Sequence, residues 1–277
     1  MKKTVLSASV IGLSVVLSAC GGMSAPATNT PSTPKTTAVT SFSGVLKEPG
    51  QQPGTFVAWS KGVVTLDAVA YPTPAINGVV VASVDSDAKG AFKIELPSAA
   101  DIKSALAVFP YGDGAAPQDC TSTLKSSVTG MKTTVIPFVD IHSSSQSGGA
   151  EPLEITSFDQ AQLKAEAVSG VIVYADRAGQ LSGTETCNYT LPDGSVQKVT
   201  QTYDASVVEG WNSLRGSLTI TATSYSETYK NGALPTQWIA SISEAPAPAP
   251  DPTPTPTPMQ TLSISKLNKL FEGTAQK

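Results

Sequence analysis

The chain has 277 residues, of which 14% are charged, and its net charge at pH 7 is −4. Average soluble domains are about 25% charged, and proteins that bind nucleic-acid phosphates need an excess of basic side chains. The composition therefore excludes a basic nucleic-acid-binding protein. Hydrophobic residues make up 40%, which excludes a wholly disordered chain.

The N-terminus has the features of an export signal. Lys2 and Lys3 precede an uncharged, apolar run over residues 5–19. Because a membrane-spanning helix needs about 20 apolar residues, this shorter run is typical of a signal peptide. We expect residues 1–19 to be the signal peptide.

The run ends in Leu17-Ser18-Ala19-Cys20, which resembles the lipobox of bacterial lipoproteins. The resemblance implies cleavage before Cys20, a diacylglycerol on its sulfur and an acyl chain such as palmitate on the new N-terminus. It implies no other cofactor. Two or more acyl chains give stable membrane anchoring. Gly21 stands where an inner-membrane retention signal would place Asp, so the resemblance implies the exported side of the envelope, and the outer membrane if the cell has one.

Two linkers enclose the foldable part of the chain. Residues 20–38 are rich in Ser, Thr, Ala and Pro and predict a flexible tether. Residues 245–258 alternate Ala-Pro and Thr-Pro, which favours an extended polyproline spacer. The tail, 259–277, has an apolar stripe at helical spacing. We expect it either to dock on an envelope partner or membrane surface, or to stay solvated.

Residues 39–115 predict a first β-sandwich. Phe92, Ile94 and Leu96 alternate with polar residues, which is typical of a half-buried strand. Residues 85–90 predict a turn before that strand. Further strands are expected at 55–59, 63–71 and 79–82.

The segment Gly78-Val79-Val80-Val81, followed by Ser86-Asp87-Ala88-Lys89-Gly90-Ala91-Phe92-Lys93-Ile94, resembles the carboxypeptidase-regulatory-like or transthyretin-like β-sandwich. The likeness covers about 50 residues and rests on a short motif. In this chain the two motif strands follow each other almost directly. The resemblance implies a non-catalytic accessory module of exported proteins.

Residues 116–244 predict a second β-rich domain, so the expected fold class is all-β, with two small antiparallel sandwich-like domains. Lys230-Asn231-Gly232 predicts a hairpin turn, and a capping box with an apolar stripe predicts a helix over 158–168. The expected strands are 133–141, 170–175, 182–190, 196–203, 214–224 and 237–242.

Once Cys20 is lipidated, Cys120 and Cys187 remain as an even pair in an oxidising compartment. We expect a disulfide, with two separate thiols as the alternative. A disulfide closing this 67-residue separation would stabilise the protein by about 4 kcal/mol on the chain-entropy model.

No catalytic or metal-binding motif stands out. His142 is expected to be a solvated loop residue rather than a catalytic base, because no Gly-x-Ser-x-Gly nucleophile motif accompanies it. Asp85 and Asp87 are expected to act in a turn rather than as calcium ligands, since the EF-hand spacing is missing. We therefore predict no catalytic residue and no metal site.

Tyr225 and Tyr229 are expected to be exposed, because Thr, Ser and Glu surround them. Exposed aromatic rings on a sheet can stack on sugars, which makes these two the candidate ligand-binding residues. The leading hypothesis is a lipid-anchored, non-catalytic binding or scaffolding protein of the cell envelope. Its partners would be the membrane and either a cell-wall glycan or an envelope protein. The alternatives are an envelope hydrolase with an unidentified carboxylate site and a carbohydrate-binding module.

Overall fold

The structure is a computed structural model that describes residues 38–243, apart from residues 53, 73–77, 110–119 and 191–194. The expected signal peptide, the lipidation site Cys20, nearly all of the tether 20–38, the linker 245–258 and the tail 259–277 lie outside the described residues. Within the described part, no helix is long and apolar enough to cross a membrane.

Strands dominate the described residues, which confirms the all-β class. A single turn of 3-10 helix, η1 (Lys103–Ala105), is the helical element among them. The strands are β1 (Ser41–Pro49), β2 (Phe56–Ala58), β3 (Thr65–Ala70), β4 (Val79–Asp85), β5 (Ala91–Glu95), β6 (Ala107–Val108), β7 (Cys120–Ser122), β8 (Lys125–Ser126), β9 (Lys132–Ile136), β10 (Val139–His142), β11 (Ser147–Asp159), β12 (Lys164–Ala175), β13 (Gly179–Thr190), β14 (Val196–Val207), β15 (Gly210–Ile220), β16 (Ser224–Asn231) and β17 (Gln237–Ser243).

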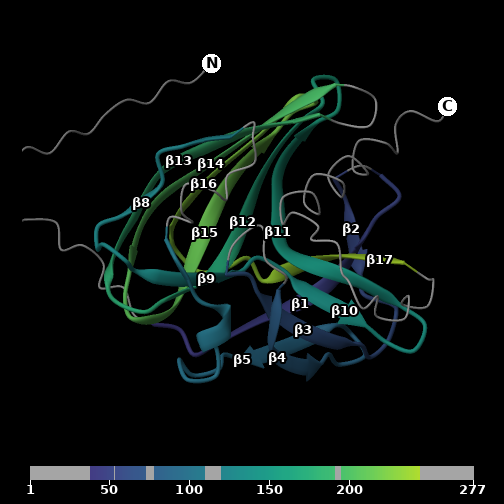
Figure 1. Ribbon diagram of the computed structural model, residues 1–277. Helices are drawn as coiled ribbons and strands as arrows, with labels where there is room; N and C mark the ends of the chain where they lie inside the picture. Colours follow the sequence, from purple (N-terminus) through teal and green to yellow (C-terminus); the bar gives the residue numbers. More distant parts are fainter. Residues whose placement is uncertain (1–37, 53, 73–77, 110–119, 191–194, 244–277) are drawn as a thin grey trace, which may run out of the picture. The chain divides into compact units, whose positions relative to one another are not determined.

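The first sheet has the strand order β5-β1-β17-β11-β10-β3-β4, and β2 pairs with the end of β1 beyond β5. β1 and β17 run parallel, whereas the other neighbours are antiparallel. β1 and β17 come from opposite ends of the described chain and lie side by side (Figure 1). Within this sheet β11 contributes only its first part, up to Pro152.

The second sheet has the order β12-β15-β16-β14-β13, with β7 and β8 along the outer edge of β13. β9 and the second part of β11 pair with successive halves of the other edge of β12, and β6 pairs with β9. β14 and β16 run parallel. The long strand β11 therefore passes from one sheet into the other (Figure 1).

Apolar side chains fill three clusters, each set by the alternation of strand residues. The largest lies against the first sheet and includes Leu46, Leu66 and Trp238, together with Ile172 and Tyr174 from β12 of the second sheet. Two smaller clusters lie on the other face of β12 and its neighbours, one around Val173 and Leu214 and one around Ala167 and Leu218. β12 therefore buries residues on both of its faces and contributes side chains to all three clusters.

The turn predicted over 85–90 is present and has a clear cause. The Asp87 carboxylate accepts hydrogen bonds from the backbone N–H groups of Lys89 and Ala91, both at 2.8 Å. Gly90 has a φ of +82°, a conformation that glycine adopts without a steric penalty. Asp87 therefore acts as a turn residue.

Two local predictions are wrong. Residues 158–168 do not form a helix: β11 runs to Asp159, a turn follows, and β12 begins at Lys164. Asn231 does not open a hairpin, because β16 ends there and β17 pairs with β1 and β11 of the first sheet. In both places tertiary pairing overrides a local preference that is worth at most about 1 kcal/mol.

Strand pairing crosses the expected boundary between residues 39–115 and 116–244. β1 pairs with β17, and β3 pairs with β10. The described residues group as one compact unit. Alternation in the sequence marks where strands are, but it carries no information about a partner far along the chain.

Candidate functional site

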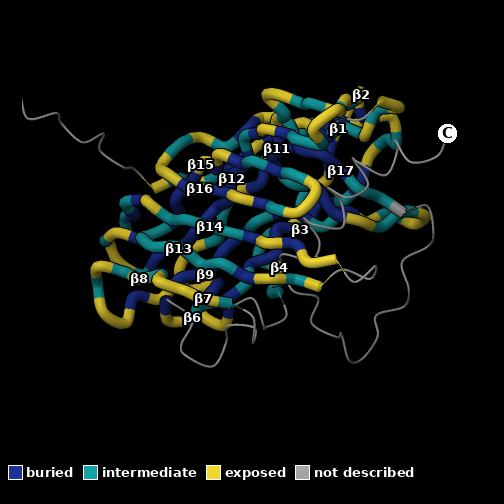
Figure 2. Tube along the Cα trace, turned by 90° about the horizontal axis from the view of Figure 1, so that it is seen from above, coloured by how far each residue is buried: buried dark blue, intermediate teal, exposed yellow. Residues whose placement is uncertain are grey.

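The two faces of the second sheet differ in chemistry although the same strands supply both. Cys187, Val199, Tyr225 and Ile220 are register partners across β13, β14, β16 and β15, and all four are buried. The neighbouring register row is Thr186, Thr200, Ser226 and Thr219, and each of these is at least partly exposed. Buried residues alternate with less buried ones along these strands in Figure 2. We call the two surfaces the inner face and the outer face.

A buried carboxyl group lies at the centre of the inner face. Glu227 on β16 is 2% exposed. Its Oε2 accepts hydrogen bonds from the hydroxyls of Tyr225 (2.7 Å) and Tyr229 (2.6 Å). The Ser169 hydroxyl on β12 donates to Oε1, and the Gln201 side chain on β14 also hydrogen-bonds to the carboxyl. We call these five residues the Glu227 cluster.

Gly216 on β15 makes room for this cluster. A Cβ at that position would collide with the Ser169 hydroxyl and would lie 2.7 Å from Glu227 Oε1. The residue lies between β12 and β16, in register with Ser169 on one side and Tyr229 on the other. Gly216 therefore allows a hydrogen bond that spans two strand spacings.

Burial controls the protonation of the cluster. Loss of hydration raises the pKa of Glu227 above its ordinary value, while its four hydrogen bonds act in the opposite direction. The pKa values of Tyr225 and Tyr229 lie well above 10, mainly through burial and then through the nearby Glu227 charge. A carboxylate has about four acceptor positions, and four protein side chains take them up. The arrangement favours a fixed structural group over a reactive one.

The exposure predicted for Tyr225 and Tyr229 is wrong: they are 8% and 5% exposed. Both rings face inward with Glu227 between them, at the spacing of two that places residues on one side of a strand. The sequence reasoning missed Glu227, Ser169 and Gln201. The signal was there in Tyr-Ser-Glu-Thr-Tyr, where a carboxylate occupies the same face as two large aromatic residues.

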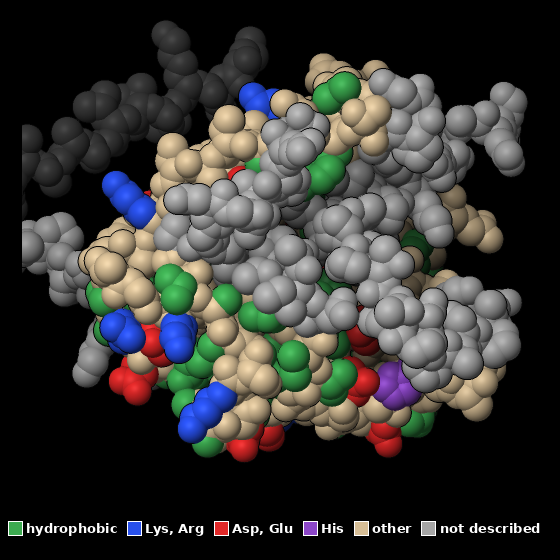
Figure 3. All heavy atoms as spheres, in the orientation of Figure 1, with side chains coloured by type: hydrophobic (Ala, Val, Ile, Leu, Met, Phe, Trp, Pro, Cys, Tyr) green, Lys and Arg blue, Asp and Glu red, His purple; other side chains and the backbone are tan. Residues whose placement is uncertain are grey.

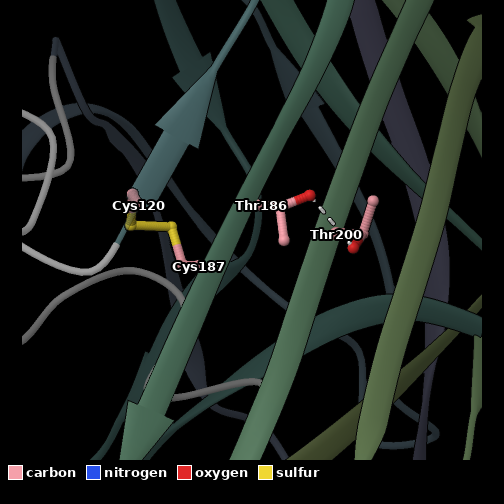
Figure 4. The surroundings of a disulfide bond; sticks show 4 residues. All are labelled: Cys120, Thr186, Cys187 and Thr200. Carbon is pink, nitrogen blue, oxygen red and sulfur yellow. Dashed lines mark hydrogen bonds between the residues drawn. A yellow bond between two sulfur atoms is a disulfide. The ribbon is translucent and has the colours of Figure 1, made fainter.

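The predicted disulfide is present. Cys120 on β7 and Cys187 on β13 are register partners with a Cα–Cα distance of 4.0 Å. Figure 4 shows this bond beside Thr186, whose hydroxyl lies 3.3 Å from that of Thr200 on β14. The disulfide fixes the short edge strand β7 to the sheet, and it fits a protein that folds in an oxidising compartment.

The outer face carries two adjacent register rows made entirely of hydroxyl side chains. Neighbouring threonines are also hydrogen-bonded, with the Thr184 and Thr202 hydroxyl oxygens 3.0 Å apart. Charged residues begin in the next rows, with Lys198 on one side and Asp204, Arg215 and Lys230 on the other. We call the two rows the hydroxyl face; its residues are Thr184, Thr186, Thr200, Thr202, Ser217, Thr219, Ser226 and Thr228.

His142 lies at the end of β10 and not in a loop, with its Nδ1 3.4 Å from Oδ2 of Asp67 on β3. The Ser83 hydroxyl donates to the other oxygen of Asp67 at 2.5 Å. In a catalytic triad the serine bonds to the histidine, whereas here the serine bonds to the aspartate and the histidine lies beside that same aspartate. The histidine is seen beside acidic side chains in Figure 3. This arrangement does not activate a nucleophile.

Among the residues that the structure describes, no group of three or more His, Cys, Asp or Glu side chains is placed to hold a metal ion. Comparison of the chain with protein-family models, with curated proteins and with solved structures found no match in any of the three.

Proposed function

We propose that this protein is a non-catalytic binding protein, held on the exported side of the cell envelope by lipid on Cys20. The sequence Leu17-Ser18-Ala19-Cys20 behind an apolar run supports the anchor. The Cys120–Cys187 disulfide supports folding outside the cytoplasm.

The observation that carries the binding role is the hydroxyl face. Most residues of the inner face are at least nine-tenths buried. On the outer face, the same strands present two uninterrupted rows of hydroxyl side chains. Such a surface offers donors and acceptors in a fixed pattern. The titratable group that is most deeply buried in these strands, Glu227, is saturated by protein donors and supports a structural role.

The anchor is tested by labelling cells with radioactive palmitate and separating membrane from soluble fractions, for the wild type and for Cys20→Ser. We expect label and membrane association for the wild type and loss of both for the variant. Label on the Cys20→Ser chain would contradict the proposal. Ser18→Thr, which leaves Ala19 and Cys20 on the two sides of the cleavage site unchanged, serves as the matched control and should behave as the wild type does.

A further inference from the structure

We infer that the hydroxyl face binds an uncharged, hydroxyl-rich polysaccharide along rows of threonine and serine side chains. This inference rests on the proposed binding function and names the chemical class of its ligand.

The chemistry of the face selects the ligand class. The two rows carry no Lys or Arg, so they offer little to a phosphate or sulfate polymer. They carry no Trp, Tyr or Arg, the residues that dominate the energy of protein–protein interfaces. What they do offer is hydroxyl groups, each able to donate one hydrogen bond and accept two. The hydroxyls of a neutral sugar have the same capacity.

The geometry of the face favours a polymer over a single sugar. One hydrogen bond formed in water contributes only about 0.5–1.5 kcal/mol, so a single sugar ring would bind weakly. The rows cross four strands in register, β13, β14, β16 and β15, which are spaced about 4.8 Å apart. A row therefore spans about 14 Å, and Thr121 on β7 extends one row by another strand. A repeating chain can contact several positions at once.

The rows are also held rigidly. The Thr184–Thr202 and Thr186–Thr200 hydroxyl pairs lie 3.0 Å and 3.3 Å apart. β-branched side chains have few rotamers, and the disulfide secures the edge of the sheet beside them. Preorganised groups lose less entropy on binding, and many lipid-anchored copies on one surface would add avidity.

The test is co-sedimentation of the full mature chain, carrying Cys20→Ser to omit the lipid, with insoluble chitin, with insoluble cellulose and with a sulfated dextran resin. The variant combines Thr184→Val, Thr186→Val, Thr200→Val and Thr202→Val, which removes four hydroxyls and keeps side-chain shape and strand preference. The matched control makes four Thr→Val changes at exposed positions away from the face, namely Thr40, Thr129, Thr156 and Thr236. Circular dichroism and melting temperature verify that each chain is folded.

We expect the parent and the control to sediment with at least one of the two polysaccharides, and the face variant to bind at least tenfold more weakly. Equal binding by the face variant and the parent would overturn the inference, because another surface would then carry the ligand. Failure of the parent to bind either polysaccharide would overturn it too. The palmitate and fractionation result would still stand, so the anchoring proposal and the ligand inference fail separately. Binding only to a sulfated dextran resin would identify an anionic ligand and overturn the neutral class.

Discussion

The inner and outer faces of the second sheet both carry polar side chains, but these are buried on the inner face and accessible to water on the outer face. On the outer face, Thr184 and Thr202 keep access to water, and their mutual hydrogen bond is optional. On the inner face, the Glu227 carboxyl has lost its water and depends on hydrogen bonds from Ser169, Tyr225, Tyr229 and Gln201. The free-energy cost of a polar side chain on a strand is therefore small when it points to water, and large when it points inward and lacks hydrogen-bond partners.

The largest expected effect comes from removing the inner carboxyl. Glu227→Ala leaves three buried hydroxyls without their acceptor, and we expect the free energy of unfolding to fall by about 3–5 kcal/mol. Thr228→Val alters the next residue, which lies on the hydroxyl face, and should change the free energy of unfolding by less than about 0.5 kcal/mol. Urea denaturation of both variants measures this contrast. Similar losses for the two variants would refute the distinction between the faces.

The next effect tests the edge of the sheet that both faces share. Replacing Cys120 and Cys187 together by Ala frees β7 from β13, and we expect a loss of about 2–4 kcal/mol. The measurement is urea denaturation under non-reducing conditions. Adding a reductant to the wild type should give a similar loss, whereas the double variant should not respond to it. A double variant as stable as the wild type would show that β-pairing alone holds this edge.

The third effect is a loss of stability from adding a side chain at Gly216, the residue on β15 that lies between Ser169 and Tyr229. Gly216→Ala places a methyl against Ser169 and Glu227, and overpacking of this kind costs about 1–3 kcal/mol. Because the nearest obstruction is the Ser169 hydroxyl, Ser169→Ala should cost less in the Gly216→Ala background than in the wild type. Thermal unfolding of the four chains in this cycle tests the coupling. Simple additivity would contradict the geometry described.

The smallest expected effect is a dependence on pH. Since the folded-state pKa of Glu227 is raised, the folded chain binds more protons than the unfolded chain between the ordinary and the raised value. Stability is then lost as pH rises through that interval. Glu227→Gln removes the titration, so wild-type stability should decline relative to this variant from about pH 4.5 upward and level off above the raised pKa. Denaturation at several pH values checks the difference, and Glu154→Gln, at an exposed carboxyl on β11, controls for charge. If the wild type instead became more stable relative to Glu227→Gln as the pH rises, the assigned direction of the Glu227 pKa shift would be wrong.

The sequence by itself determined the properties that depend on composition and local pattern. The all-β class followed from alternation such as that of Phe92 and Ile94, which fits only a strand with one buried side. The Asp87 turn followed from side-chain chemistry acting over four residues. The disulfide followed from an even number of cysteines once Cys20 is assigned to the lipid.

Only the tertiary structure decided which strands are neighbours and which way the polar residues face. Phe158 and Val168 lie at helical spacing, but pairing of β11 and β12 placed this stretch in strands. Tyr225 and Tyr229 have polar neighbours in sequence, which predicted exposure, yet β16 lies between β15 and β14 and turns both rings inward. Glu227 is separated from Ser169 by 58 residues. The local alternation places Glu227 on the same face as Tyr225 and Tyr229, but it does not reveal that this face is buried or that Ser169 lies opposite, because contacts between distant parts of the chain set both.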